Sequence, residues 1–169
     1  MADPRALYQE VIIEHNKKPR NYGTLECHSH HAVGHNPLCG DHIDVELNIG
    51  RDIGNNVADE RIEDIAFQGS ACAICKSSAS MMTMAIKGKT RTEAELLISE
   101  FLDMATGKLD IADAQHIGRL RVFSGIRDLP VRVKCAILPW HTLNAALNAS
   151  ENASTEAQHD PMQTSIDDA

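Results

Sequence analysis

The chain has 169 residues, of which 43% are hydrophobic but only 4% aromatic, and it carries a formal net charge of −8 at pH 7. This composition suffices for one domain with its own core, and the scarcity of aromatic residues favours an α/β or helical body over an all-β one. The chain has no basic stripe, which argues against a nucleic-acid partner because phosphate binding needs clustered Lys and Arg. We predict a single domain over residues 1–149 and a disordered acidic tail over residues 150–169, where five acids and no Lys or Arg fall.

No segment has the length of continuous apolar sequence that a membrane span needs, and no apolar signal segment follows the N-terminus. We therefore expect a soluble cytoplasmic protein that has no membrane partner. The chain has five cysteines, an odd number, and thiols stay reduced in the cytosol. These cysteines are accordingly better candidates for metal ligands or nucleophiles than for a disulfide framework.

The first half of the chain predicts one helix and two strands. A helix is expected from Pro4, a favourable first-turn residue, and it should end before Pro19. Residues 42–49 alternate strictly between apolar and polar side chains, which is typical of a half-buried strand. Residues 61–67 predict a second strand, and the Gly- and Asn-rich residues 50–56 predict the loop of a hairpin between the two.

The second half of the chain is predicted to be helical. Residues 73–86 keep Ala, Met and Ile in helical register, and Thr90 with Glu93 forms a capping-box pattern before a helix that ends at Gly107. Residues 110–118 predict another short helix. A last helix is expected from Pro130, with a kink or break at Pro139, whose ring would clash with the carbonyl of Cys135.

Three cysteines and one aspartate occupy positions from which their side chains could bind a metal ion. Cys39 and Asp41 lie in a Pro- and Gly-containing loop before the first strand, and Cys72 opens a helix, where the helix dipole favours a thiolate. Cys135 follows Arg132 and Lys134, whose charges also favour a thiolate. Three thiolates and a carboxylate can complete a tetrahedral zinc site. The alternative, that these cysteines are buried small apolar residues, stays open on spacing alone.

Several long motifs carry a family resemblance. The chain resembles the SufU branch of the IscU and NifU N-terminal family of iron–sulfur cluster assembly proteins. The matching segments cover residues 7–12, 18–21, 36–41, 67–82 and 130–143. This resemblance implies an α+β, SufE/NifU-like fold, in which a small antiparallel sheet of about three strands packs with helices.

The resemblance also implies a site and a function. Cys39, Asp41, Cys72 and Cys135 fall on the family's metal ligands, for Zn²⁺ or a transient [2Fe–2S] cluster, and Cys39 falls on the thiol that accepts sulfur. Arg132 would assist docking or the local charge. The implied partners are a SufS-like cysteine desulfurase, which hands over persulfide sulfur, and downstream Suf assembly proteins or apo iron–sulfur proteins. As an enzyme, the protein would be at most a zinc-dependent sulfurtransferase acting with that desulfurase.

Two other readings of the same ligands remain open. In the first, the protein is a true scaffold that assembles a [2Fe–2S] cluster on the four residues. In the second, it is a zinc-stabilised interaction domain without sulfur chemistry. The IscU branch has a His before its last cysteine, whereas this chain has Lys134, as SufU proteins do, which favours exchangeable zinc.

Two features of the sequence depart from a simple four-ligand site. Cys75 forms a Cys-x-x-Cys pattern with Cys72 and occupies a position where relatives usually have a small hydroxyl residue or alanine. We interpret it as a buried small side chain, with a spare thiol or an alternative ligand as the other reading. The second feature is a group of four histidines: His28, His30, His31 and His35. We interpret their segment as a solvated loop, with a second metal site as the alternative.

Overall fold

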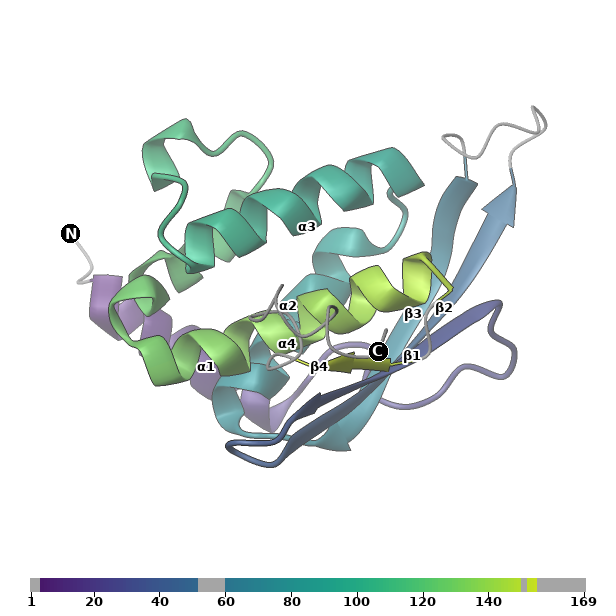
Figure 1. Cartoon of the computed structure of the whole chain (residues 1–169), viewed down its shortest axis with the longest axis horizontal. Helices are drawn as coiled ribbons and strands as arrows, with labels where there is room; N and C mark the ends of the chain where they lie inside the picture. The colour runs from purple at the N-terminus through teal and green to yellow at the C-terminus, as the bar shows by residue number, and fades with distance from the viewer. Residues whose placement is uncertain (1–3, 52–59, 150–151, 155–169) are drawn as a thin grey trace, which may run out of the picture.

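The computed structural model describes residues 4–51, 60–149 and 152–154. Four α-helices, two 3₁₀ segments and four strands make up this part of the chain (Figure 1). In chain order they are α1 (Pro4–Lys17), β1 (His30–Asn36), β2 (Asp41–Arg51), β3 (Glu60–Ser70), α2 (Ala73–Ile86), α3 (Arg91–Ala105), η2 (Ile111–Asp113), η3 (Gly118–Asp128), α4 (Pro130–Leu147) and β4 (Asn152–Ser154).

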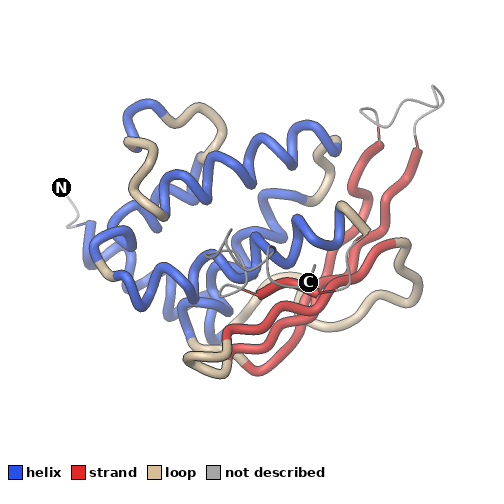
Figure 2. Tube along the Cα trace, viewed as in Figure 1, coloured by secondary structure: helices blue, strands red, loops and turns tan. Residues whose placement is uncertain are grey.

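The strands form one sheet in the order β3-β2-β1-β4. β1, β2 and β3 are antiparallel neighbours, and the short β4 pairs in parallel with β1 (Figure 2). The helices gather on one face of this sheet (Figure 1). The predicted α+β class, with a small antiparallel sheet packed against helices, is therefore confirmed.

The core fills the space between the sheet and the helices. Trp140 of α4 is fully buried and stacks on Phe101 of α3, with ring centroids 4.3 Å apart. Its indole N–H donates to the hydroxyl of Ser78 on α2, so the polar atom of the ring is also satisfied. Fully or nearly fully buried aliphatic side chains of the strands complete the core: Ile43, Val45, Leu47, Ile62 and Ile65.

Helix α2 is the most enclosed helix, and it buries four hydroxyl side chains that all have partners. Ser77 donates to the carbonyl of Ile12 in α1, and Ser78 donates to that of Ala136 in α4. Ser80 pairs with His15, and Thr83 donates to the carbonyl of Ser80. Because small hydroxyl residues occupy little volume and leave no buried polar atom unsatisfied, α1 and α4 can pack closely on α2.

The predicted hairpin and the two central helices agree with the structure. β2 and β3 pair over the segments predicted as strands, α2 spans the predicted residues 73–86, and Thr90 caps α3 with both hydrogen bonds of a capping box. Of the predicted kink or break at Pro139, the break is wrong, because α4 runs through that residue to Leu147. Tight packing of the surrounding residues outweighs the hydrogen bond that the proline removes. The kink stays a prediction.

Other segments differ from the sequence-based expectation. The histidine-rich residues before Asn36, which the sequence predicts as a solvated loop, form strand β1 from His30 onward. The short helix expected over residues 110–118 is reduced to the three residues of η2, and the longer 3₁₀ segment η3 follows it. Gly50 and Arg51, expected in a loop, extend β2, whereas the rest of that predicted loop lies outside the described residues.

The expected disordered tail lies almost wholly outside the described residues. Its three described residues, Asn152–Ser154, form β4 beside β1 and therefore differ from that expectation. Among the described helices, none combines the length and the apolar character needed to cross a bilayer.

The approach of α4 to β1 depends on Gly34, and this can be tested. A Cβ atom at Gly34 would overlap the Thr142 hydroxyl and would lie 3.2 Å from Cδ1 of Leu138. We expect Gly34→Ala to lower the free energy of unfolding by about 1–3 kcal/mol, as overpacked core positions do. Gly125→Ala is the matched control because a Cβ there meets no atom within 4 Å. Equal denaturant midpoints for the two variants would contradict this packing.

Candidate metal centre

Cys39 lies at the tip of the β1–β2 hairpin. Asn36 pairs with Asp41 at the end of the ladder, which leaves residues 37–40 as the connecting loop. The buried Asn36 shapes this loop, because its side-chain oxygen accepts the N–H of Leu38 and its carbonyl accepts that of Gly40. Gly40 has a φ of +78°, a conformation that side chains disfavour. The loop thus holds the Cys39 thiol at the protein surface.

Asp41 is the first residue of β2, and only 3% of its surface is exposed. One carboxylate oxygen accepts the backbone N–H of Cys72 at 2.8 Å, and the other lies 3.5 Å from the Cys72 sulfur. Within the described part of the chain, no Lys or Arg forms an ion pair with this carboxylate. Burying such a charge costs several kcal/mol unless hydrogen bonds or a metal ion compensate it.

Cys72 is the N-cap residue of α2, with extended backbone angles, and its sulfur accepts the N–H of Cys75 at 3.4 Å. A hydrogen bond from Cys135 is the main cause that lowers the pKa of Cys72 to about 7, and the amides at the start of α2 act in the same direction. The predicted thiolate character of Cys72 therefore agrees with the geometry.

Cys135 is buried on the second turn of α4, and its sulfur lies 4.0 Å from that of Cys39. Its hydrogen bond to Cys72 is the main cause that raises its pKa, and burial raises the pKa further. The expectation that Arg132 and Lys134 would favour a thiolate here is wrong for the metal-free protein. The pKa of Cys39 is also raised, mainly by desolvation of its sulfur.

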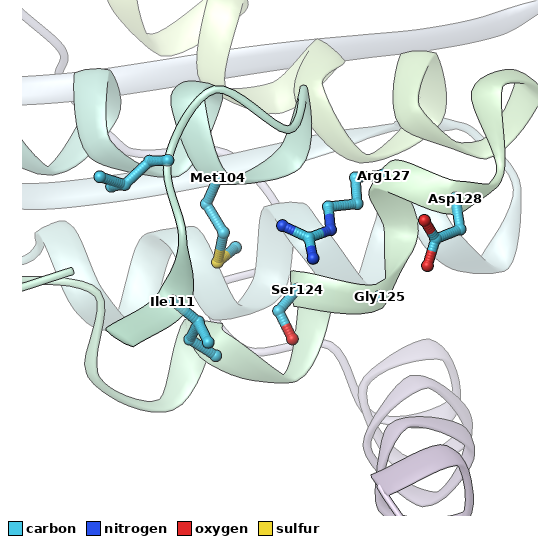
Figure 3. Close-up of a pocket in the computed structure, with 7 residues that line it drawn as sticks. Met104, Ile111, Ser124, Gly125, Arg127 and Asp128 are labelled. Atoms are coloured by element: carbon cyan, nitrogen blue, oxygen red, sulfur yellow. The ribbon is translucent and has the colours of Figure 1, made fainter. Parts of the chain in front are cut away.

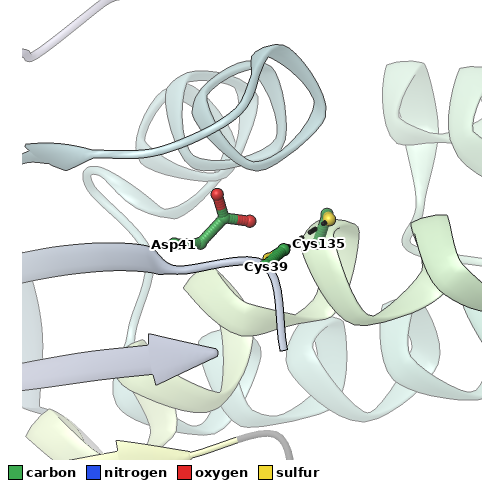
Figure 4. Close-up of side chains that lie close together, drawn as sticks. All are labelled: Cys39, Asp41 and Cys135. Carbon is green, nitrogen blue, oxygen red and sulfur yellow. Dashed lines mark hydrogen bonds between the residues drawn. The ribbon is translucent and has the colours of Figure 1, made fainter. Parts of the chain in front are cut away.

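The structure brings three of the four predicted ligands into one close group and places Cys72 beside it. Ligand atoms of Cys39, Asp41 and Cys135 all lie within 4.8 Å of one another (Figure 4), and Cys72 adjoins this group through Asp41. A tetrahedral zinc with typical bond lengths separates its sulfur and oxygen ligands by about 3.5–3.8 Å. The Cys72 sulfur lies 3.5 Å from an Asp41 carboxylate oxygen and the Cys39 and Cys135 sulfurs lie 4.0 Å apart, and both separations are close to that range. The donor set of three sulfurs and one carboxylate therefore fits Zn²⁺.

Two residues flank the centre without joining it. Arg132 is exposed on the first turn of α4, and its positive charge lowers the pKa of Tyr8, which burial raises more strongly. Tyr8 was not predicted as a site residue. Its hydroxyl oxygen is buried without a hydrogen-bond partner in the described structure, and Cys72 and Cys135 are both close enough to influence its pKa. From the sequence alone, Tyr8 is indicated only as one of the apolar residues on a face of the first helix.

The remaining candidate ligands do not belong to this group. Cys75 is fully buried, as we interpreted it from the sequence, and burial raises its pKa well above the ordinary value. His31 and His35 are exposed on one face of β1, while His30 lies on the other. His28 lies beside Glu46, with Nδ1 3.8 Å from the carboxylate. Across the described ranges, none of these histidines belongs to a close group of three potential metal ligands.

A small cavity of about 140 Å³ lies elsewhere, between the end of α3 and η3. Figure 3 shows Met104, Ser124 and Arg127 around it. No member of the cysteine group lines this cavity, so it is separate from the candidate centre.

Comparison with known proteins agrees with these observations. Residues 7–104 match the NifU-like N-terminal domain. The chain is 38% identical to the zinc-dependent sulfurtransferase SufU of Bacillus subtilis, over 86% of this chain and 92% of that protein. It is 36% identical to the iron–sulfur cluster assembly scaffold protein IscU of Streptococcus pyogenes, over 87% of this chain and 86% of that protein.

A solved structure shows the same likeness. A protein of Fervidobacterium islandicum, described as an iron–sulfur cluster assembly scaffold for the SUF system, matches with a TM-score of 0.71 and 32% identity. The match covers 85% of this chain and 98% of that one. The resemblance predicted from the sequence is thereby confirmed: the chain belongs to the family of NifU-like N-terminal domains, with IscU and SufU proteins among its relatives.

Proposed function

We propose that this protein works in iron–sulfur cluster assembly as a zinc-containing sulfur acceptor, which takes persulfide sulfur from a cysteine desulfurase at Cys39. The observation that carries the proposal is the buried Asp41 carboxylate, which lies among three thiols and forms no ion pair with a described Lys or Arg. A divalent cation would compensate that charge. The name of the Bacillus subtilis relative, a zinc-dependent sulfurtransferase, supports the same metal and reaction.

In this proposal Cys39, Asp41, Cys72 and Cys135 hold the zinc. When bound, the ion keeps its thiol ligands deprotonated at neutral pH, because it competes with their protons. This matters for Cys39 and Cys135, whose pKa values are raised in the metal-free protein. Asp41 is the hardest of the four donors and the least suited to zinc, so the site is more exchangeable than a four-cysteine site.

The exposure of Cys39 supports the acceptor role that we propose for it. Its thiol lies on an exposed loop, whereas Cys135 is 4% exposed and Cys72 is half-buried. The Cys39 thiolate attacks the outer sulfur of the desulfurase persulfide. A new S–S bond forms on Cys39, the old one breaks, and the desulfurase cysteine leaves as a thiolate. Access by a second protein is therefore required only at the hairpin tip.

The surroundings of Cys39 suit such a partner. Leu38, which precedes Cys39 in the loop, is 73% exposed. Val131, on the first turn of α4, is 76% exposed. Arg132 is exposed on that helix turn, and we assign it to docking or to the local charge. We propose a SufS-like cysteine desulfurase as the sulfur donor, Suf assembly proteins or apo iron–sulfur proteins as recipients, and the cytoplasm as the compartment, since it keeps thiols reduced.

A scaffold role is the second candidate. The Streptococcus pyogenes and Thermotoga maritima relatives are named as assembly scaffolds, and three thiols with a carboxylate can also hold a [2Fe–2S] cluster as cargo. Anaerobic reconstitution with iron and sulfide separates the two candidates. Rapid transfer of a reconstituted cluster to an apo-ferredoxin favours the scaffold, whereas zinc that iron cannot displace favours the acceptor.

The acceptor proposal predicts that Cys39→Ala abolishes stimulation of the desulfurase. Without the Cys39 thiol, no group of this protein attacks the persulfide of the desulfurase. The rate of alanine production should therefore fall to that of the desulfurase alone. Cys27→Ala is the matched control, because Cys27 is an exposed thiol outside the metal group. Full stimulation by the Cys39 variant would exclude this thiol as the acceptor.

The proposal also predicts that Asp41→Asn weakens zinc binding roughly tenfold or more, since it removes one charged ligand. The amide oxygen can still accept the N–H of Cys72, so the metal-free variant should be no less stable than the metal-free parent. Competition with a chromogenic chelator and thermal unfolding with and without zinc measure both effects. Asp44→Asn, a carboxylate on the outer face of the same strand, should change neither. Unaltered zinc affinity in the Asp41 variant would show that this carboxylate is not a ligand.

A further inference from the structure

The proposed function leaves Cys75 without a role, although this residue lies next to the centre. Cys75 is fully buried at the third position of α2, and Cys72 is the N-cap of the same helix. The backbone N–H of Cys75 donates to the Cys72 sulfur at 3.4 Å. The first helical turn therefore holds the Cys72 thiol against the Cys75 residue.

This arrangement has a known chemical use. A Cys-x-x-Cys pair at a helix N-terminus is the redox-active pair of disulfide oxidoreductases, in which the first thiol is accessible and the second is sheltered. Here Cys72 is partly exposed and Cys75 is 0% exposed. The two residues thus have the unequal accessibility that such a pair needs.

We propose that Cys72 and Cys75 form a reversible disulfide when the metal-free centre meets a peroxide, and that this disulfide withdraws Cys72 from the ligand set. The disulfide itself stands on the geometry of α2. Its effect on metal binding rests on the proposed function, because only a thiolate at Cys72 can be a ligand.

The chemistry balances with hydrogen peroxide as the oxidant. The Cys72 thiolate attacks one peroxide oxygen, the O–O bond breaks, and Cys72 becomes a sulfenic acid as hydroxide leaves. The sulfur of Cys75 then attacks the Cys72 sulfur, the S–O bond breaks, and the hydroxyl leaves as water with the Cys75 proton. Two thiols are oxidised by two electrons, and one peroxide is reduced. A dithiol reductant reverses the result by thiol–disulfide exchange.

A competing pair exists in the same centre, because the Cys39 and Cys135 sulfurs lie 4.0 Å apart. Those two residues belong to different elements, the β1–β2 hairpin and α4, and both must rotate or shift to reach bonding distance. Cys72 and Cys75 share a single helical turn. The short connection makes the Cys75 thiol the nearest resolving group along the chain for an oxidised Cys72.

Peptide mapping of the oxidised full chain tests the proposal. Reduced, chelator-treated protein is exposed to hydrogen peroxide, digested and analysed by mass spectrometry, in parallel with Cys75→Ser and with Cys27→Ser as the control. We expect the wild type and the Cys27 variant to form a Cys72–Cys75 disulfide that dithiothreitol removes. The Cys75 variant should instead trap Cys72 as a dimedone-reactive sulfenic acid and then lose it irreversibly to sulfinic acid.

Zinc-binding capacity gives a second readout. After peroxide and then dithiothreitol, the wild type should regain its full zinc stoichiometry, and Cys75→Ser should not. A Cys39–Cys135 disulfide in the wild type, or equal recovery of the two proteins, would overturn the proposal. Circular dichroism checks that Cys75→Ser folds, and Cys75→Ala serves as the second variant. Desulfurase stimulation by the reduced variants tests the proposed function separately, since no disulfide enters that assay.

Discussion

The buried carboxylate of Asp41 is the constraint on which the arrangement of the centre depends. It accepts the N–H of Cys72, and so it joins the loop end of the β1–β2 hairpin to the residue that precedes α2. A carboxylate that is 3% exposed is costly unless its charge is compensated, and the hydrogen bonds from the N–H and the thiol of Cys72 compensate it only in part. The fold therefore places a carboxylate that has no ion pair with a described Lys or Arg beside three thiols, a combination that suits a soft divalent cation.

Helix α2 supplies the second constraint, because it controls how closely α4 approaches. Ser78 links the Trp140 indole to the carbonyl of Ala136, and both contacts lie in the interior. A larger or unpaired side chain at this position would move α4 and, with it, Cys135. The position of one ligand thus depends on a serine that is not itself a ligand. Packing between α2 and α4 therefore contributes to the geometry of the centre, as does the loop that carries Cys39.

Much of the fold could be predicted because local sequence and tertiary structure agree there. The alternation over β2 and the Thr90 cap of α3 needed no knowledge of distant contacts. β1 could not be predicted, because its histidines and Gly34 obscure the alternation, and the strand is defined by pairing with β2 and by packing against α4. The passage of α4 through Pro139 likewise depends on tertiary packing, which a local rule for proline does not include.

For the centre, the residues could be predicted but their chemical states could not. Family motifs pointed to Cys39, Asp41, Cys72 and Cys135, yet the spacings contain no information about which thiol keeps a proton. That depends on residues that meet only in the folded chain: the interaction with Cys135 lowers the pKa of Cys72, and the same interaction together with burial raises the pKa of Cys135. The cations that precede Cys135 in the sequence suggested the opposite. Tertiary contacts and burial of the thiol outweigh the charges of these sequence neighbours.

The cysteines around the centre differ in solvent exposure, and this difference limits the reactions that each can undergo. Of the four proposed ligands, Asp41 and Cys135 are buried and Cys72 is half-buried, so in the proposed function sulfur that arrives on another protein meets the exposed Cys39 first. A small molecule can also reach the partly exposed Cys72. Cys75 is fully buried and can react only with groups inside the protein, of which Cys72 is on the same helical turn. In the two proposals, intermolecular chemistry therefore belongs to Cys39 of the loop and intramolecular chemistry to the pair at the start of α2, although Cys39 and Cys72 both lie near the Asp41 carboxylate.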